Sequence, residues 1–220
     1  MPLSFRPPLP QPATIAGPAG QLEARVDDPA PGAVPAAVGV VCHPHPLYGG
    51  TLQNKVVRTL ARAMQELGVP TVRFNFRGVG GSAGSYDAGV GELEDALAAC
   101  AWARQRWDCA TLWLAGFSFG AAVALQAAGS ARPDALVTVA PPVGRIIVTP
   151  VARPSCPWLV VQGDRDELVD AASVRRWVGD FVPPPSLVML SGAEHFFHGR
   201  LGELRAAVLG FLTGETAGEA

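Results

Sequence analysis

The chain has 220 residues, of which 49% are hydrophobic and 16% are charged, and its formal net charge is −2. This length and apolar content predict one globular domain spanning residues 1–220 and exclude a disordered chain. With both signs scattered along the chain, the charge gives no electrostatic basis for binding nucleic acid or a membrane surface.

The N-terminal sequence MPLSFRPPLPQP is rich in proline and lacks the continuous apolar segment of a secretory signal. No apolar run in the chain approaches the ~20 residues that a membrane-spanning helix needs. The four cysteines, Cys42, Cys100, Cys109 and Cys156, form no C-x-x-C pair. We therefore expect a cytoplasmic protein with reduced cysteines, in which residues 1–12 form a loosely held arm.

After this arm, the sequence ATIAGPAGQLEARVDD predicts two short strands around a Pro-Ala-Gly turn. Further strands are indicated by apolar runs at residues 36–42, 71–76, 110–115, 135–140, 158–162 and 186–190. Most of these runs are continuously apolar, which is typical of strands covered on both faces of a sheet.

Helical patterns lie between these runs. Residues 53–67 carry one apolar stripe that ends before Gly68, and residues 92–107 carry another with acidic residues in the first turn. Strands that alternate with helices predict an α/β fold with a mostly parallel central sheet and helices on both faces. In such sheets, ligands bind at the carboxyl ends of the strands.

The pattern G-x-S-x-G occurs twice, at residues 80–84 and 116–120. Ser118 lies where a strand pattern changes directly into a helix pattern, and such a turn would hold its hydroxyl exposed at a helix N-terminus. Ser82 lacks a helix directly after it, so we interpret it as part of a loop. The overlapping G-x-G-x-x-A at residues 78–83 lacks the helix and the later acidic residue of a dinucleotide site.

A neutral serine hydroxyl needs a base, and the base needs an orienting carboxylate. Carboxylates follow the strand at 158–162 in the sequence GDRDELVD, and histidines follow the strand at 186–190 in SGAEHFFHG. Asp170 suits the N-cap of a helix that starts near Ala171. Asp164 or Asp166, and His195 or His198, remain as candidates for the acid and the base.

Five segments together resemble the α/β-hydrolase superfamily, in particular short serine esterases related to dienelactone hydrolases and prolyl-oligopeptidase catalytic domains. They are VVCHPHPLYGG, FNFRGVGGSAGSYDAGVGELEDA, GFSFG, QGDRDELVD and GAEHFFHG, in the family's order from about Val40 onward. The resemblance implies Ser118 as nucleophile, Asp166 as acid within G-x-x-D-x-x-V, and His195 as base. Asp164 and His198 are the alternatives.

The oxyanion that forms during acyl transfer needs two backbone N–H donors. Phe119 follows the nucleophile and can supply one of them. In the HPHP segment, Pro44 and Pro46 have no N–H to give, which leaves the backbone of His45 or of Leu47. The resemblance favours His45.

The segment 141–157 is too short for a lid domain, so we expect an open site. The expected apolar rim consists of Leu47, Tyr48, Phe117, Phe196 and Phe197, although Phe117 and Phe196 are equally compatible with the core. These features predict a serine hydrolase that cleaves small-molecule esters or thioesters of small to medium acyl groups without a cofactor. No sequence feature specifies an oligomeric state.

Two other classes fit parts of the sequence. His43, His45, His195 and His198, with Asp166, could be ligands of a metal-dependent hydrolase, although this leaves the serine turn unexplained. The same three residues Ser118, Asp166 and His195 would also serve a peptidase or an acyltransferase, and a binding module could retain the fold without turnover.

Overall fold

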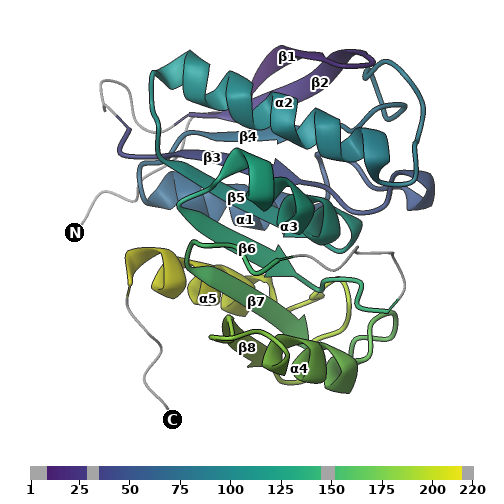
Figure 1. The fold of residues 1–220 in the computed structure, drawn as a ribbon, viewed down its shortest axis with the longest axis vertical. Helices are drawn as coiled ribbons and strands as arrows, with labels where there is room; N and C mark the ends of the chain where they lie inside the picture. The colour runs from purple at the N-terminus through teal and green to yellow at the C-terminus, as the bar shows by residue number, and fades with distance from the viewer. Residues whose placement is uncertain (1–8, 29–34, 145–151, 215–220) are drawn as a thin grey trace.

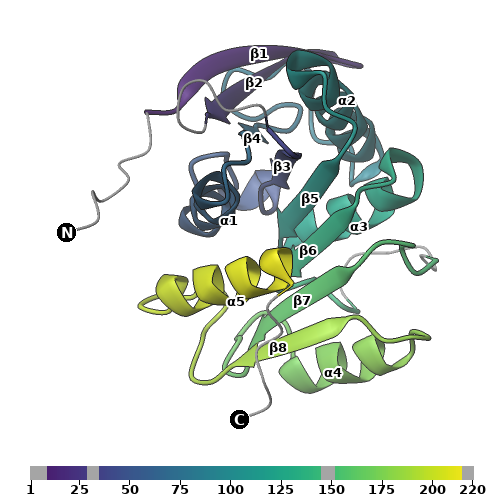
Figure 2. The ribbon, with the colours of Figure 1, turned by 90° about the vertical axis from the view of Figure 1, so that its left-hand side faces the viewer.

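The computed structural model describes residues 9–28, 35–144 and 152–214. Within these residues, eight strands form one sheet in the order β1-β2-β4-β3-β5-β6-β7-β8 (Figures 1 and 2). β1 pairs with β2, and β2 with β4, in antiparallel fashion, and all other neighbours are parallel. The strands are β1 (Gln11–Gly17), β2 (Gly20–Asp27), β3 (Val38–Cys42), β4 (Thr71–Phe74), β5 (Leu112–Phe117), β6 (Ala135–Val139), β7 (Trp158–Gly163) and β8 (Ser186–Leu190).

Helices cover both faces of the sheet (Figure 2). The helices are α1 (Lys55–Glu66), α2 (Val90–Trp107), α3 (Phe119–Ala131), α4 (Ala171–Gly179) and α5 (Leu201–Thr213), with a short 3₁₀ helix η1 (Pro46–Tyr48). Apolar side chains of α2, α3 and α4 share one core cluster with one face of the sheet. Those of α1 and α5 share a second cluster with the other face. The expected α/β architecture is confirmed.

The amino end of the chain differs from the expectation. The strand β1 begins at Gln11, and Gln11 and Pro12 pair with Val26 and Arg25, so these two residues belong to the sheet and not to an arm. Pro12 is tolerated there because β1 is an edge strand, where a missing N–H need not break the ladder. Residues 1–8 of the expected arm lie outside the described residues.

The strand expected at residues 71–76 ends at Phe74. Asn75 and Phe76 leave the sheet because their groups bind other partners: the Asn75 Oδ1 accepts the Leu52 N–H at 2.8 Å, and the Phe76 N–H donates to His43 Nε2 at 3.0 Å. The carboxyl end of β4 is thereby fixed to the loops that follow β3.

All four cysteines are free thiols, and Cys42, Cys100 and Cys156 are buried. Burial raises the pKa of Cys100 to about 12, so this thiol stays protonated and packs as a small apolar side chain. No helix in the described part of the chain has the length and apolar character needed to cross a membrane.

Candidate active site

Ser118 lies between the last residue of β5 and the first residue of α3, with backbone angles φ 53° and ψ −120°. A positive φ is unfavourable for a residue with a side chain, and such strain is retained where the surrounding structure enforces it. Here the Ser118 N–H donates to Val139 O at 2.8 Å, and its carbonyl accepts from the N–H of Ala121. The serine is therefore held in the sharp turn that the sequence indicates.

The glycines around Ser118 are required by the close approach of three segments. A Cβ at Gly116 would lie 2.0 Å from the carbonyl oxygen of Gly120. A Cβ at Gly120 would lie 2.4 Å from the carbonyl oxygens of both Cys42 and His43. The G-x-S-x-G pattern thus lets α3 begin directly against the end of β3.

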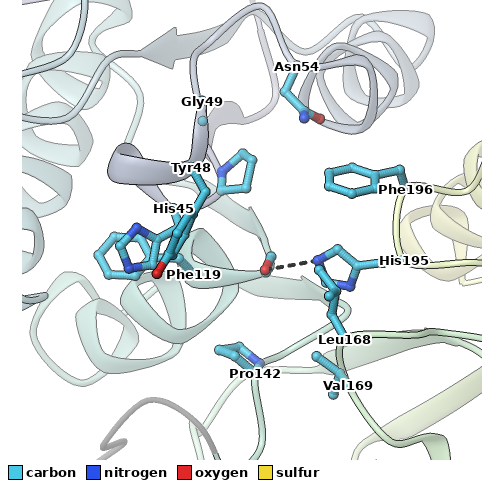
Figure 3. A pocket seen from close by; sticks show the side chains of 13 residues that line it. His45, Tyr48, Gly49, Asn54, Phe119, Pro142, Leu168, Val169, His195 and Phe196 are labelled. Atoms are coloured by element: carbon cyan, nitrogen blue, oxygen red, sulfur yellow. Dashed lines mark hydrogen bonds between the residues drawn. The ribbon is translucent and has the colours of Figure 1, made fainter.

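Three side chains from distant parts of the sequence meet at the carboxyl ends of the strands. The Ser118 Oγ lies 3.1 Å from His195 Nε2 (Figure 3), and His195 Nδ1 lies 2.8 Å from Asp166 Oδ2. Ser118 follows β5, Asp166 follows β7 and His195 follows β8. His195 is 2% exposed, so water competes little for these hydrogen bonds.

Asp166 receives four hydrogen bonds. Its Oδ1 accepts the N–H groups of Leu168 and Val169 at 2.9 and 2.8 Å, and its Oδ2 accepts from His195 and from Gln162 Nε2. Burial by itself raises the pKa of this carboxyl, but His195 and the two backbone N–H groups outweigh burial and hold the pKa below its usual value. An ionised Asp166 accepts a hydrogen bond from the Nδ1–H of His195, which leaves Nε2 as an acceptor for the serine hydroxyl.

Gln162 was not singled out from the sequence. Its Nε2 lies 2.9 Å from Asp166 Oδ2, and its own Oε1 is buried without a hydrogen-bond partner among the residues that the structure describes. The available signal was a polar amide at the end of the otherwise apolar strand sequence WLVVQ. Its donated hydrogen bond helps to orient the carboxylate.

The other candidates for the acid and the base have separate partners. Asp164 is exposed and accepts the Gly192 N–H at 2.6 Å, which ties together the loops after β7 and β8. Asp170 caps α4 by accepting the Ser173 N–H at 2.8 Å, as its position predicts. His198 is exposed beside Glu194 and precedes α5. The geometry therefore brings Asp166 and His195, and not their alternatives, to Ser118.

His45 organises the loop that follows β3. Its Nδ1 accepts the Leu47 N–H at 3.2 Å, and its carbonyl accepts the N–H groups of Tyr48 and Gly50. The Leu47 N–H therefore already donates to His45 Nδ1, whereas the His45 N–H has no acceptor within residues 9–28, 35–144 and 152–214. Of the two donors that the sequence left open, His45 is the one available to a ligand.

The side chain of His45 has a defined role in this loop. Its Nε2 lies 3.2 Å from the Tyr86 hydroxyl, and its ring centroid lies 4.7 to 5.0 Å from those of Tyr48, Tyr86 and Phe119. Partial burial lowers the pKa of His45, which favours the neutral ring that can accept at Nδ1.

A cavity of about 600 Å³ opens beside Ser118 (Figure 3). Tyr48 and Phe196 line it, as expected, and none of its described lining residues is Asp, Glu, Lys or Arg. The cavity is also lined by Leu168, Val169, Pro142 and Asn54, which the sequence does not single out. The first three belong to loops, whose course no local sequence pattern specifies.

Three of the expected rim residues are not part of the cavity lining. Phe117 and Phe197 are 0% exposed, because Phe117 ends β5 facing the α1 and α5 side of the sheet and Phe197 turns inward at φ 54°. These two predictions were wrong: both rings belong to the core, and Phe117 supports the His195 ring at 5.1 Å. Leu47 is 65% exposed and lies outside the lining.

The histidines do not form the metal site that was considered from the sequence. Both ring nitrogens of His43 have backbone partners, because Nδ1 lies 2.6 Å from Pro44 O and Nε2 accepts the Phe76 N–H. Among the described residues, no three His, Cys, Asp or Glu side chains are grouped so as to hold a metal ion.

Comparisons with known proteins show which family the chain belongs to. Residues 45–203 match the family model described as alpha/beta hydrolase domain. A serine hydrolase without a lid from Xanthomonas campestris is 43% identical, with a TM-score of 0.89 over 99% of this chain and 100% of that chain. An alpha-beta serine hydrolase homologue from Coxiella burnetii is 48% identical, with a TM-score of 0.86 over 90% of this chain and 95% of that one.

A curated relative, an uncharacterised protein from Rickettsia prowazekii, is 36% identical over 208 residues, which are 89% of this chain and 86% of the relative. The family match, these relatives and the strand-to-helix turn at Ser118 lead to one conclusion: the chain belongs to the α/β-hydrolase family.

Proposed function

We propose that the protein is a serine hydrolase that cleaves uncharged carboxylic esters or thioesters through an acyl-enzyme. The observation that carries this proposal is the hydrogen-bonded series from Ser118 Oγ through His195 to Asp166, with spacings of 3.1 and 2.8 Å. These are the contacts that convert a weak hydroxyl nucleophile into a reactive one.

In the proposed reaction, Ser118 Oγ attacks the carbonyl carbon while His195 Nε2 takes its proton. Asp166 stabilises the resulting imidazolium and keeps the ring in the correct orientation. The N–H groups of Phe119 and His45 donate to the oxyanion, and Phe119 is suited to this because the first N–H groups of a helix have no partner within the helix. The alcohol or thiol leaves with the proton from His195, and water then hydrolyses the acyl-enzyme by the same steps.

The absence of Asp, Glu, Lys and Arg from the described cavity lining supports uncharged substrates. A charged acyl group would lose water in this cavity without gaining an opposite charge there, and this would weaken its binding. A cavity of about 600 Å³ has room for a small to medium acyl group, and this is the size class that we propose.

The direct test replaces Ser118 by Ala and measures kcat for nitrophenyl esters of increasing acyl length, with a thioester and an amide alongside. We expect kcat to fall by at least ~10³, because removing one member of such a triad costs about this much or more. The variant should remain folded and should no longer be labelled by a fluorophosphonate. Ser85→Ala, which changes an exposed serine, is the control that should retain full activity and labelling.

Equal turnover by the wild type and by Ser118→Ala would contradict the proposal. Turnover that depends on Ser118 but is confined to the amide would instead favour a peptidase that uses the same residues.

A further inference from the structure

Asn54 presents an amide nitrogen to the cavity beside Ser118. Its Oδ1 caps α1 by accepting the N–H groups of Val56 and Val57 at 2.9 and 3.4 Å. Its Nδ2 makes no hydrogen bond with any residue that the structure describes, and Asn54 lines the cavity with its amide end directed inward (Figure 3). Capping needs only the oxygen, which Ser or Asp could also supply. The nitrogen is therefore a donor available to a bound molecule.

Phe196 lies on the same side of the cavity as His195 and Asn54, whereas His45, Tyr48 and Phe119 lie on the opposite side (Figure 3). The Phe196 ring contacts His195 edge-on at 5.1 Å between centroids and Phe117 at 6.0 Å. It remains 39% exposed. These contacts, and a third with His198 at 6.0 Å, hold the ring while part of it faces the cavity.

The chemistry of acylation determines which half of an ester meets this side. When the carbon–oxygen bond of the tetrahedral intermediate breaks, His195 Nε2 gives its proton to the leaving oxygen, which must lie within hydrogen-bonding distance of it. The carbonyl oxygen faces the other way, toward the N–H groups of Phe119 and His45. The alcohol half of the ester therefore extends along the His195 side.

We propose that Phe196 and Asn54 form the subsite for the alcohol half of the ester, and that this alcohol is flat, uncharged and equipped with an oxygen acceptor. The ring of Phe196 packs against the flat alcohol, and Asn54 Nδ2 donates to its hydroxyl, carbonyl or ether oxygen. This inference rests on the proposed function and adds to it the class of alcohol.

The test for Asn54 compares 4-(hydroxymethyl)phenyl acetate with 4-ethylphenyl acetate, and also the corresponding meta isomers. The members of each pair differ by a hydroxyl in place of a methyl group, and their leaving groups have closely similar acidity. We expect the wild type to favour the hydroxylated ester by about twofold to tenfold in kcat/KM, as one hydrogen bond allows. Asn54→Asp should lose this preference, because an ionised Asp keeps a capping oxygen and has no donor. Asn54→Ser should reduce the preference, because the shorter Ser side chain brings its single O–H less far into the cavity.

A structural role for Asn54 would leave the substrate ratio unchanged. Ser and Asp are good N-caps, so the melting temperature of both variants should stay close to that of the wild type. Gln53→Ser changes the exposed neighbouring residue outside the described cavity lining and is the matched control, which should keep the wild-type ratio. Deacylation, measured after the burst of phenol release, should be the same for all esters because they yield the same acetyl-enzyme. It should also be the same in all variants, because the alcohol has left its subsite before deacylation begins.

The test for Phe196 uses Phe196→Leu with phenyl acetate and ethyl acetate. Loss of the flat ring should lower kcat/KM for phenyl acetate about twofold to tenfold relative to kcat/KM for ethyl acetate. An equal loss for both esters would show that the ring acts only through His195, and the subsite would then be wrong.

The outcomes separate this inference from the proposed function. If Ser118→Ala turns over the esters as fast as the wild type, the proposed function fails. If turnover depends on Ser118 but Asn54→Asp keeps the wild-type ratio, or slows deacylation as much as acylation, the alcohol subsite alone is overturned.

Discussion

His43 and His45 lie two residues apart after β3, and each binds the backbone of the chain through its ring. His43 is buried between Pro44 O and the Phe76 N–H, and so it joins the loop after β3 to the end of β4. His45 fixes the Leu47 N–H and leaves its own N–H available beside Ser118. Both roles require a neutral ring, since each ring must accept a hydrogen bond at one nitrogen.

The neutral state of His43 predicts a dependence of stability on pH. Burial lowers the pKa of His43 to about 4, compared with about 6.5 in an unfolded chain. Between these two values the unfolded chain binds more protons than the folded chain, so stability falls as the pH is lowered. We expect the free energy of unfolding to fall by about 2 kcal/mol between pH 7 and pH 5, measured by denaturant unfolding.

The variant His43→Gln separates the contribution of His43 to the pH dependence of the unfolding free energy from the contributions of other groups. Gln keeps an acceptor for the Phe76 N–H but does not titrate, so its unfolding free energy should vary less over the same pH range. A wild-type stability that is constant from pH 7 to pH 5 would contradict the assignment.

At the scale of elements, the site depends on how closely β5, α3 and the end of β3 approach one another. Strand β5 runs directly into α3, and Gly116 and Gly120 remove the two Cβ atoms that would otherwise collide with backbone. Backbone atoms on both sides cannot move aside as the end of a flexible side chain can. The position of Ser118 therefore depends on these two glycines.

A pair of alanine substitutions in α3 tests this dependence. Gly120→Ala should destabilise the protein by about 1–3 kcal/mol through overpacking and should lower kcat/KM by displacing Ser118. Gly129→Ala lies in the same helix, where a Cβ meets nothing within 4 Å, and should stabilise the protein by about 0.5–1 kcal/mol with unchanged activity. Denaturant unfolding measures the effect on stability, and ester turnover measures the effect on activity. Equal stability and equal activity of the two variants would contradict the close approach of Gly120 to the end of β3.

At the scale of the whole molecule, a buried ion pair joins the sheet to the helical layer near the site. Arg77 follows β4, and its Nε and Nη2 donate to the two oxygens of Asp95 on α2 at 3.1 and 2.9 Å. The Asp95 side chain is 0% exposed and that of Arg77 is 10% exposed. The pair holds the loop that carries Tyr86, and through Tyr86 it connects to His45.

Removing Asp95 should leave the largely buried Arg77 guanidinium with only the exposed carboxylates of Glu94 and Asp87 as partners. We expect Asp95→Leu to lower the free energy of unfolding by about 3–5 kcal/mol, the usual result of breaking a buried pair. Glu94→Ala is the matched control, because Glu94 contacts the same Arg77 but its side chain is 57% exposed. Its loss should be below about 1 kcal/mol. Denaturant unfolding of the two variants should differ clearly, and equal losses would argue against a buried pair.

The sequence by itself determined the features that are local along the chain. Strand and helix identities followed from apolar periodicity, and the turn at Ser118 followed from glycines placed where a strand pattern meets a helix pattern. Resemblance to a known family then indicated Asp166 and His195. The strands, the helices and the turn at Ser118 could be predicted because periodicity and turn chemistry depend on residues close in sequence.

Only the tertiary structure decided where the side chains at the ends of the strands and in the loops point. In the tertiary structure, Phe117 and Phe197 are buried in the core. Asp164 accepts a hydrogen bond from Gly192, and the Leu47 N–H donates to His45. Gln162 contacts Asp166, and Asn54 lines the cavity. It also placed β3 between β4 and β5 and paired β2 with β4. Each of these outcomes depends on contacts between segments far apart in the chain, where burial and hydrogen bonding select one direction among several that the local sequence allows.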